Sequence, residues 1–156
     1  MIVAATGHRP ERLGGYGPEA FARLVQIAAG YLADVCPEMV ISGMALGWDM
    51  AVAVAALSSG FRLTAALPCD GQDAIWPDES REMHRQLVAA AAKVEIISPG
   101  PYEPRKMFVR NNWMVDRCDL LIAMWDGGNG GTAGCVNYAI KTGRPWVNLW
   151  HRYSGE

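Results

Sequence analysis

Short apolar runs alternate along the chain with longer segments in which apolar residues recur every three or four positions. The short runs are typical of buried strands, and the longer segments are typical of helices with one face against a core. We expect strands at residues 2–6, 39–42, 62–67, 94–98, 119–125 and 146–150. We expect helices at residues 18–35, 48–59, 79–92, 105–117 and 132–142.

This alternation predicts an α/β fold of the Rossmann-like type, with three layers. The sheet is expected to be mostly parallel and doubly wound, with about five to six strands and helices on both faces. The 156 residues suffice for one domain with a proper core, so residues 1–156 are expected to form a single domain. Hydrophobic residues make up 51% and charged residues 19%, which excludes a disordered chain.

In a sheet of this kind, ligands bind at the carboxyl ends of the strands, near the point where the strand order reverses. The loops after residues 6, 42, 67, 98 and 125 are therefore the places to look for chemistry. The loop after the first strand reads TGHRP and brings Gly7, His8 and Arg9 to one strand end. An ordinary turn would also explain this stretch, but polar groups gather where the fold predicts a ligand.

The second loop, in the stretch ISGMALGWD, contains two glycines and enters a helix. The first N–H groups of a helix lack partners and carry partial positive charge, so they attract anions. We therefore expect Ser42, Gly43 and Gly47 to make room for a phosphate. Trp48 is expected either to stack on a base or to cover the sheet edge. Asp49 lies in the first helical turn, where it contacts a ligand or only stabilises the helix dipole.

Two further segments offer charged groups with weaker signals. The loop PCDGQDAIWP carries Asp70, which could hold ribose hydroxyls, as could Asp49. It also carries Trp76, which could act as a lid or, like Trp48, stack on a base. Acids in such a loop are more often solvated turn residues. On the helix expected at 105–117, Arg110 could reach an anion, as could Arg105 or Lys106 at the helix start. The spacing equally fits an arginine on the solvent-exposed face of an amphipathic helix.

The loop after the fifth strand gives the strongest local signal in the chain. It reads WDGGNGGT and leads into a helix. Such a loop can cradle phosphate through its backbone N–H groups, and a hydroxyl at the helix start can add a further contact. We expect phosphate to bind at Gly127, Gly128, Gly130, Gly131 and Thr132.

Composition narrows the classes of partner. The four cysteines form no C-x-x-C pair, so no metal site is expected. The formal net charge of −2 counts mildly against a nucleic-acid partner. No apolar run is long enough to span a membrane, and the chain begins with strand-like residues instead of a signal peptide. We expect a soluble cytoplasmic protein without a bound cofactor.

Three stretches together resemble the SLOG superfamily of Rossmann-like proteins, and in particular its YpsA-like branch. They are VAATGHRP, ISGMALGWDMAVAVAAL and GGTAGCVNYAIKTGRPWVNL. SGMALGWD is also similar to a loop of DprA, the DNA-processing member. RNNWMVDRCDLLIAMWDGGNGGT is similar to a stretch of LOG, the cytokinin-activating phosphoribohydrolases. The resemblance implies a doubly wound sheet that binds nucleotides or nucleotide-derived signals.

The LOG resemblance also bears on catalysis. Arg110 falls on the catalytic Arg of LOG, and Thr132 falls on the Thr of its glycine loop. The position of the LOG catalytic Glu is Cys135 here, and a thiol replaces a carboxylate poorly in hydrolysis. Hydrolysis would therefore need another acid: Asp49, Asp126 or Asp70. The candidate catalytic residues are Arg110, Asp49 and Asp126.

These observations predict a protein that binds or senses a nucleotide or a nucleotide-derived ligand. One alternative is a LOG-like nucleotide N-glycosidase. Another is a DprA-like module that binds single-stranded DNA, which the lack of basic excess does not favour. Because the chain is rich in Trp and the resembling families often form dimers, we also expect a homodimer.

Overall fold

The computed structural model describes residues 1–155, which form a six-stranded sheet in the order β4-β3-β2-β1-β5-β6. All neighbouring strands pair in parallel. The strands are β1 (Ile2–Gly7), β2 (Met39–Ser42), β3 (Leu63–Leu67), β4 (Lys93–Ile96), β5 (Leu120–Met124) and β6 (Trp146–Asn148). The predicted α/β fold with a parallel, doubly wound sheet is confirmed.

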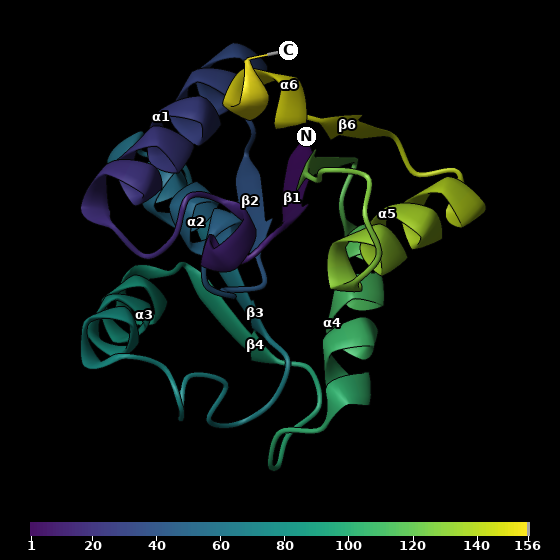
Figure 1. The fold of residues 1–156 in the computed structure, drawn as a ribbon. Coiled ribbons are helices and arrows are strands. Elements are labelled where there is room, and N and C mark those ends of the chain that lie inside the picture. Colours follow the sequence, from purple (N-terminus) through teal and green to yellow (C-terminus); the bar gives the residue numbers. More distant parts are fainter. Residues whose placement is uncertain (156) are drawn as a thin grey trace.

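Helices cover both faces of the sheet (Figure 1). The 3-10 turn η1 (Pro10–Arg12) precedes α1 (Pro18–Val35), α2 (Trp48–Ser58), α3 (Asp78–Ala90), α4 (Pro104–Arg117), α5 (Gly131–Thr142) and α6 (Trp150–Ser154). Helices α1, α2 and α3 lie on one face with α6 against α1, and α4 and α5 lie on the other. Pro18 and Pro104 begin α1 and α4, where the missing N–H of proline costs nothing.

The strands supply apolar side chains to two separate cores. Val3 and Ala5 of β1 belong to the core shared with α1 and α2, whereas Ala4 between them belongs to the core shared with α4 and α5. Successive side chains of a strand point to opposite faces, so a strand covered by helices on both sides must be apolar at every position. This explains why the central strands read as continuous apolar runs.

The carboxyl-terminal strand is shorter than the sequence pattern predicts. The apolar run at 146–150 suggests one strand, but β6 ends at Asn148 and α6 begins at Trp150. Asn148 causes the break, because its Oδ1 accepts hydrogen bonds from the backbone N–H groups of Trp125 and Trp150. A side chain that satisfies nearby backbone groups competes with strand pairing.

The strand order reverses between β1 and β5. From β1 the chain proceeds outward through β2, β3 and β4, and then returns to place β5 on the other side of β1. The loops that follow β1 and β5 therefore diverge and leave a crevice at this edge of the sheet. Within residues 1–155, no helix combines the length and apolar character needed to cross a membrane.

Candidate functional site

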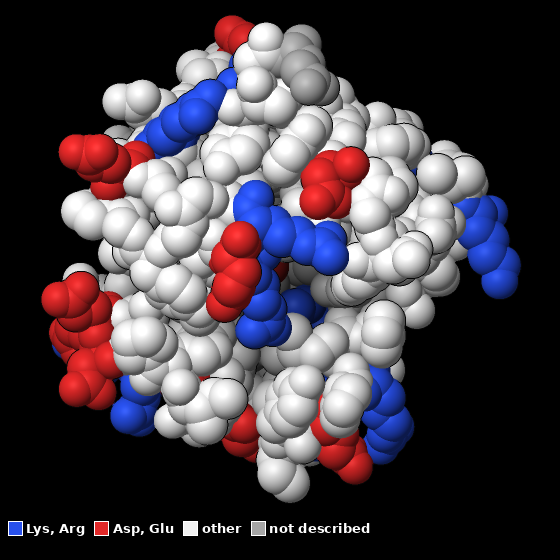
Figure 2. All heavy atoms as spheres, viewed as in Figure 1, with Lys and Arg blue, Asp and Glu red and all other residues white. Residues whose placement is uncertain are grey.

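A cleft of about 430 Å³ opens at this reversal point. Its walls come from the end of β1 and η1, the first turn of α2, the first half of α4, and the start of α5. Figure 2 shows Lys and Arg side chains gathered around a hollow near the centre of this face. The sequence-predicted residues that line the cleft are Gly7, His8, Arg9, Asp49, Arg110, Gly130, Gly131 and Thr132.

Three of the predicted glycines make room for other parts of the chain, and for Gly43 and Gly47 this differs from the phosphate contact that we expected. A Cβ at Gly7 would lie 2.5 Å from the Trp48 ring, and a Cβ at Gly43 would lie 2.6 Å from the Arg110 guanidinium. A Cβ at Gly47, where φ is +91°, would lie 2.5 Å from the carbonyl oxygen of His8. Gly43 and Gly47 thus make room for parts of the chain itself, and neither lines the cleft.

Ser42 also acts inside the loop and is not available to a phosphate. Its hydroxyl donates to the carbonyl oxygen of Asp49 (2.8 Å) and accepts from the N–H of Met44 (3.1 Å). Met44 is fully buried and has a positive φ of 61°, which is uncommon for a residue with a side chain. The loop after β2 therefore fixes the start of α2, and only Ala45 and Asp49 from this region reach the cleft.

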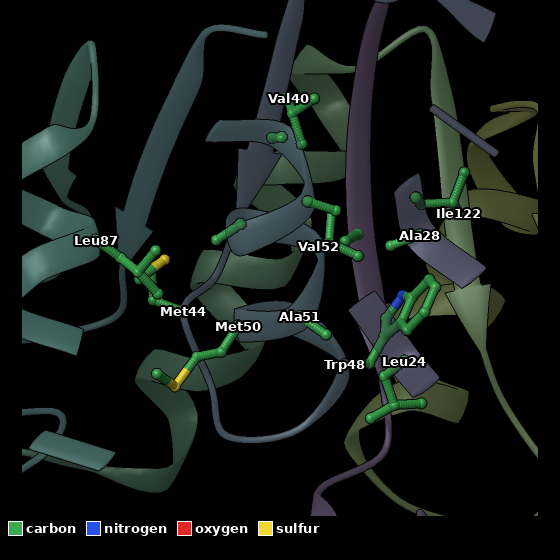
Figure 3. Close-up of a cluster of buried hydrophobic side chains, with 14 of the residues drawn as sticks. Leu24, Ala28, Val40, Met44, Trp48, Met50, Ala51, Val52, Leu87 and Ile122 are labelled. Atoms are coloured by element: carbon green, nitrogen blue, oxygen red, sulfur yellow. The ribbon is translucent and has the colours of Figure 1, made fainter. Parts of the chain in front are cut away.

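Trp48 does not face the cleft, which corrects the first of the two roles that we considered for it, stacking on a base. Its side chain is fully buried, and in Figure 3 it lies with Leu24, Ala28 and Ile122 inside the core. Trp76 is also buried and contacts the edge of His84, with ring centres 5.3 Å apart. Neither indole can stack on a base in the cleft.

Arg110 is buried under the cleft and is held by backbone groups. Its Nη1 donates to the carbonyl oxygens of Gly43 (2.5 Å) and Ala66 (3.3 Å), and its Nε donates to Asn111 Oδ1 (2.9 Å). Burial lowers the pKa of Arg110, and Asp49 partly offsets this effect. Arg110 therefore joins α4 to the ends of β2 and β3, besides placing positive charge at the cleft.

Asp49 is a buried carboxylate at the cleft floor. Its side chain is 5% exposed, and its Oδ1 has no hydrogen-bond partner within residues 1–155. Burial raises the pKa of Asp49 to about 6, although Arg110, the Ala45 backbone N–H and Arg9 act in the opposite direction. A perturbed carboxylate inside a cleft is a common mark of a functional site.

The other candidate acids have structural partners. Asp126 Oδ1 accepts from the Gly128 N–H (2.8 Å) and lies 2.9 Å from His8 Nε2 and 3.7 Å from Arg12 Nη1. The Gly128 N–H lowers the pKa of Asp126 most, and His8 adds to this effect. Asp70 Oδ2 accepts from the Gly100 N–H (2.7 Å), outside the cleft.

The glycine loop before α5 has a braced first half and an open second half. Trp125 Nε1 donates to the carbonyl oxygen of Gly128, and a Cβ at Gly128 would contact Asp126 at 3.0 Å. Gly127 and Gly128 do not line the cleft. Gly130 and Gly131 do, and nothing lies within 4 Å of a Cβ built on either of them. Thr132 follows in the first turn of α5, 7% exposed.

Cys135, which the resemblance to LOG aligns with the catalytic Glu of that family, is a core residue. Its thiol is 1% exposed and packs with Ala4, Met114 and Ala139. Burial raises the pKa of Cys135 to about 12, so the group is a neutral thiol at physiological pH. It can act neither as a general base nor as a carboxylate that stabilises positive charge.

The cleft lining also includes residues that sequence reasoning did not assign to the site, among them the charged Glu11 and Arg12, the aromatic Tyr102 and Phe108, and Asn111. Tyr102 is 58% exposed and Phe108 is 52% exposed, so both rings have free faces. Phe108 and Asn111 are three residues apart, a spacing that puts them on one side of α4 next to Arg110. That spacing is the signal by which the sequence could have revealed them.

A larger cavity of about 610 Å³ lies between α1, α2 and α3. Its lining is mainly apolar and includes Phe21, Val25, Met50, Val54 and Met83. Of the residues predicted for the site, only Gly47 borders it. The arginines and the aspartate predicted for the site lie in the smaller cleft. Within residues 1–155, no cluster of three or more His, Cys, Asp or Glu side chains could hold a metal ion.

Several bacterial proteins are similar to this chain in sequence. YoqJ, an uncharacterized SPbeta prophage-derived protein of Bacillus subtilis strain 168, is 32% identical in an alignment of 88 residues that covers 49% of this chain and 52% of YoqJ. A UPF0398 protein of Bacillus pumilus strain SAFR-032 is 25% identical over 152 residues, covering 90% of this chain and 80% of that protein.

Solved structures share the fold at low sequence identity. DprA of Helicobacter pylori, described as having a unique single-stranded DNA binding mode, has a TM-score of 0.67 and 21% identity over 94% of this chain and 63% of its own. DprA of Streptococcus pneumoniae has a TM-score of 0.66 and 20% identity, and the match covers 92% of this chain and 48% of that protein. The molybdenum cofactor binding protein of Rippkaea orientalis has a TM-score of 0.61 and 18% identity over 99% and 84%.

The chain spans about half the length of YoqJ and of the pneumococcal DprA. The sequence model of the DNA recombination-mediator protein A family matches residues 18–154. Together with the UPF0398 relatives, this match confirms the predicted resemblance to the SLOG superfamily with its YpsA-like branch. The chain belongs to the DNA recombination-mediator protein A family.

Proposed function

We propose that this protein binds a nucleotide or a nucleotide-derived ligand in the cleft between the loops after β1 and β5. The observation that carries the proposal is a convergence of positive charge with an open helix start. Arg9, Arg12 and Arg110 line the same cleft as Gly130 and Gly131. Arginine is well suited to phosphate because its planar group can donate two parallel hydrogen bonds.

The phosphate would lie at the start of α5. The first N–H groups of a helix have no partner within the helix and attract anions. Apart from the adjoining backbone, nothing lies within 4 Å of where a Cβ would be at Gly130 or Gly131, so a phosphate can approach this part of the chain. Arg9 is exposed at the cleft, and within residues 1–155 it makes no side-chain hydrogen bond or ion pair. Its guanidinium is therefore free to pair with the ligand.

The base would lie near the cleft mouth. Tyr102 and Phe108 are more than half exposed there, and they replace Trp48 and Trp76 as the aromatic groups able to stack on a base. Stacking of a base on an aromatic side chain contributes about 1–3 kcal/mol and tolerates different bases. The fold itself hosts different ligands, because its neighbours are described as binding single-stranded DNA or a molybdenum cofactor.

A thermal-shift screen against mono-, di- and cyclic nucleotides, NAD and ADP-ribose tests this proposal. A ligand at a hundred times its dissociation constant adds about 2.7 kcal/mol to the free energy of unfolding, which raises the melting temperature by several degrees. A flat screen at millimolar concentrations would contradict the proposal. Gel shifts with single-stranded oligonucleotides would then test the DNA-binding alternative, which predicts a steep dependence on salt.

Replacing Arg9 should weaken binding without affecting the fold. We expect Arg9→Ala to raise the dissociation constant of the best nucleotide about ten-fold or more, because a hydrogen bond to a charged group contributes about 1.5–3 kcal/mol. Isothermal titration calorimetry measures the change. Arg105→Ala is the matched control, since Arg105 is an exposed arginine that does not line the cleft. Equal losses in both variants would place the ligand elsewhere.

A second candidate function is hydrolysis of the N-glycosidic bond of the bound nucleotide. It is favoured by one observation: Asp49 alone, of the three candidate acids, lines the cleft, and it lies there with Arg110. If it is correct, chromatography detects release of free base, and Asp49→Asn lowers the rate by about 100-fold. Release of base by the wild type and the variant at equal rates would exclude this role for Asp49.

A further inference from the structure

One oxygen of the Asp49 carboxylate is an unsatisfied hydrogen-bond acceptor. Its Oδ1 is buried and has no partner within residues 1–155, although a buried carboxylate oxygen is costly to leave unsatisfied. The carboxylate lines the cleft, and its terminal torsion is soft, so a small rotation can present either oxygen to a bound molecule. The protein therefore leaves one acceptor for a ligand at the floor of its binding cleft.

The charges around Asp49 restrict what that ligand group can be. Arg110 on α4 and Arg9 after β1 are the cationic groups that act on it, and the thiol of Cys135 on α5 is also near. Neither arginine forms an ion pair with Asp49 within the described part of the chain. A phosphate placed against this carboxylate would be repelled, and a cationic group would be repelled by Arg110 and Arg9. A neutral donor therefore fits best.

In a nucleotide, the sugar hydroxyls are neutral donors that lie between the phosphate and the base. The cleft has the same order of parts, with Gly130 and Gly131 for the phosphate, Asp49 at the floor, and Tyr102 and Phe108 at the mouth. We infer that Asp49 accepts a hydrogen bond from a ribose hydroxyl and thereby makes the site selective for ribonucleotides over deoxyribonucleotides. This inference rests on the proposed nucleotide-binding function and specifies its ligand class.

The selectivity should be large, because a site that offers a buried acceptor rejects an analogue that cannot satisfy it. A preference for ribose would also distinguish this cleft from a binding site for single-stranded DNA, whose sugars lack the 2′-hydroxyl. The probes are ADP and GDP, each compared with its 2′-deoxy and 2′,3′-dideoxy counterparts by isothermal titration calorimetry. We expect both the 2′-deoxy and the 2′,3′-dideoxy compounds to bind the wild type about 10- to 100-fold more weakly than the ribonucleotides.

Two variants assign the selectivity to Asp49. Asp49→Asn keeps the shape but loses the negative charge, so the preference for ribose should shrink to a few-fold. Asp70→Asn is the control, because Asp70 bonds the Gly100 N–H outside the cleft; it should keep the full preference. Melting curves confirm that both variants are folded before they are titrated.

The outcomes separate this inference from the proposal on which it rests. Equal binding of ribo-, deoxy- and dideoxynucleotides by the wild type overturns the inference and leaves nucleotide binding intact. A ribose preference that persists unchanged in Asp49→Asn overturns the role of Asp49. If no compound of either series binds, both the inference and the proposed function are wrong.

Discussion

Replacing Gly47 with alanine should destabilise the protein by more than about 3 kcal/mol, one of the two largest effects that we expect. Two causes add at this position. The backbone has a φ of +91°, which residues with a Cβ rarely adopt, and the new Cβ would lie 2.5 Å from the carbonyl oxygen of His8 and 3.0 Å from Cα of Arg9. Both contacts are to backbone, so no side-chain rotation relieves them.

Chemical denaturation measures this effect, and Gly60→Ala is the matched control. Gly60 has a φ of +81°, but nothing lies within 4 Å of a Cβ built on it. Its replacement should therefore cost only the backbone term, about 1 kcal/mol. If the two variants unfold at the same denaturant concentration, the close packing of the β1 and β2 loops is not as the structure has it.

Asp49→Asn should stabilise the protein at neutral and alkaline pH, by about 2–3 kcal/mol at about pH 8. The pKa of Asp49 is raised from 3.8 to about 6, so the folded protein holds this proton more tightly than the unfolded chain does. The stability contributed by the protonated carboxyl is present below about pH 4 and is lost as the pH rises through about 6. Asparagine resembles the protonated form and should escape that loss.

Thermal or denaturant unfolding at several pH values measures this difference. The advantage of Asp49→Asn should vanish at about pH 4, where the wild-type carboxyl is also neutral. Asp34→Asn, at an exposed position near the end of α1, should change stability by less than about 0.5 kcal/mol at either pH. A variant that is less stable than the wild type at pH 8 would show that Asp49 contributes more as an anion than its burial costs.

Asp49 thus illustrates a residue whose presence costs stability. Its ionised side chain is buried without a full set of partners, and replacing it with a neutral group should improve the fold. Groups of this kind are expected at binding and catalytic sites, where a residue that function requires can lower the stability of the fold. The prediction about stability and the inference about ribose selectivity therefore both test the buried, incompletely hydrogen-bonded carboxylate of Asp49.

The fold could be predicted from the sequence because its signals are local. The strands of the sheet centre are buried on both faces and read as uninterrupted apolar runs, and the bounds of α1 and β2 agree with the predicted ranges. The segment after β6 could not be predicted in the same way. There the apolar run continues, and the break depends on hydrogen bonds that Asn148 Oδ1 accepts from the backbone N–H groups of Trp125, after β5, and Trp150, at the start of α6.

The sequence predicted the edge of the sheet at which a cleft opens, but only some of the residues that line it. The loops after β1 and β5 meet as the strand order requires, and Arg9, Asp49, Arg110 and Thr132 line one cleft. The glycines of the β2 loop were misinterpreted because sequence cannot tell whether a glycine makes room for a ligand or for another part of the chain. Gly43 makes room for Arg110, a residue 67 positions away.

The most direct test of the central claim is to map nucleotide binding on the protein by NMR. In ¹H–¹⁵N spectra titrated with ADP or GDP, we expect the amide signals of Gly130, Gly131, Thr132 and Arg9 to shift progressively and to saturate. Signals of Val25 and Val54, which border the apolar cavity between α1 and α2, should stay in place. Saturable shifts confined to the apolar cavity, or no shifts at the start of α5, would contradict a phosphate site in the cleft.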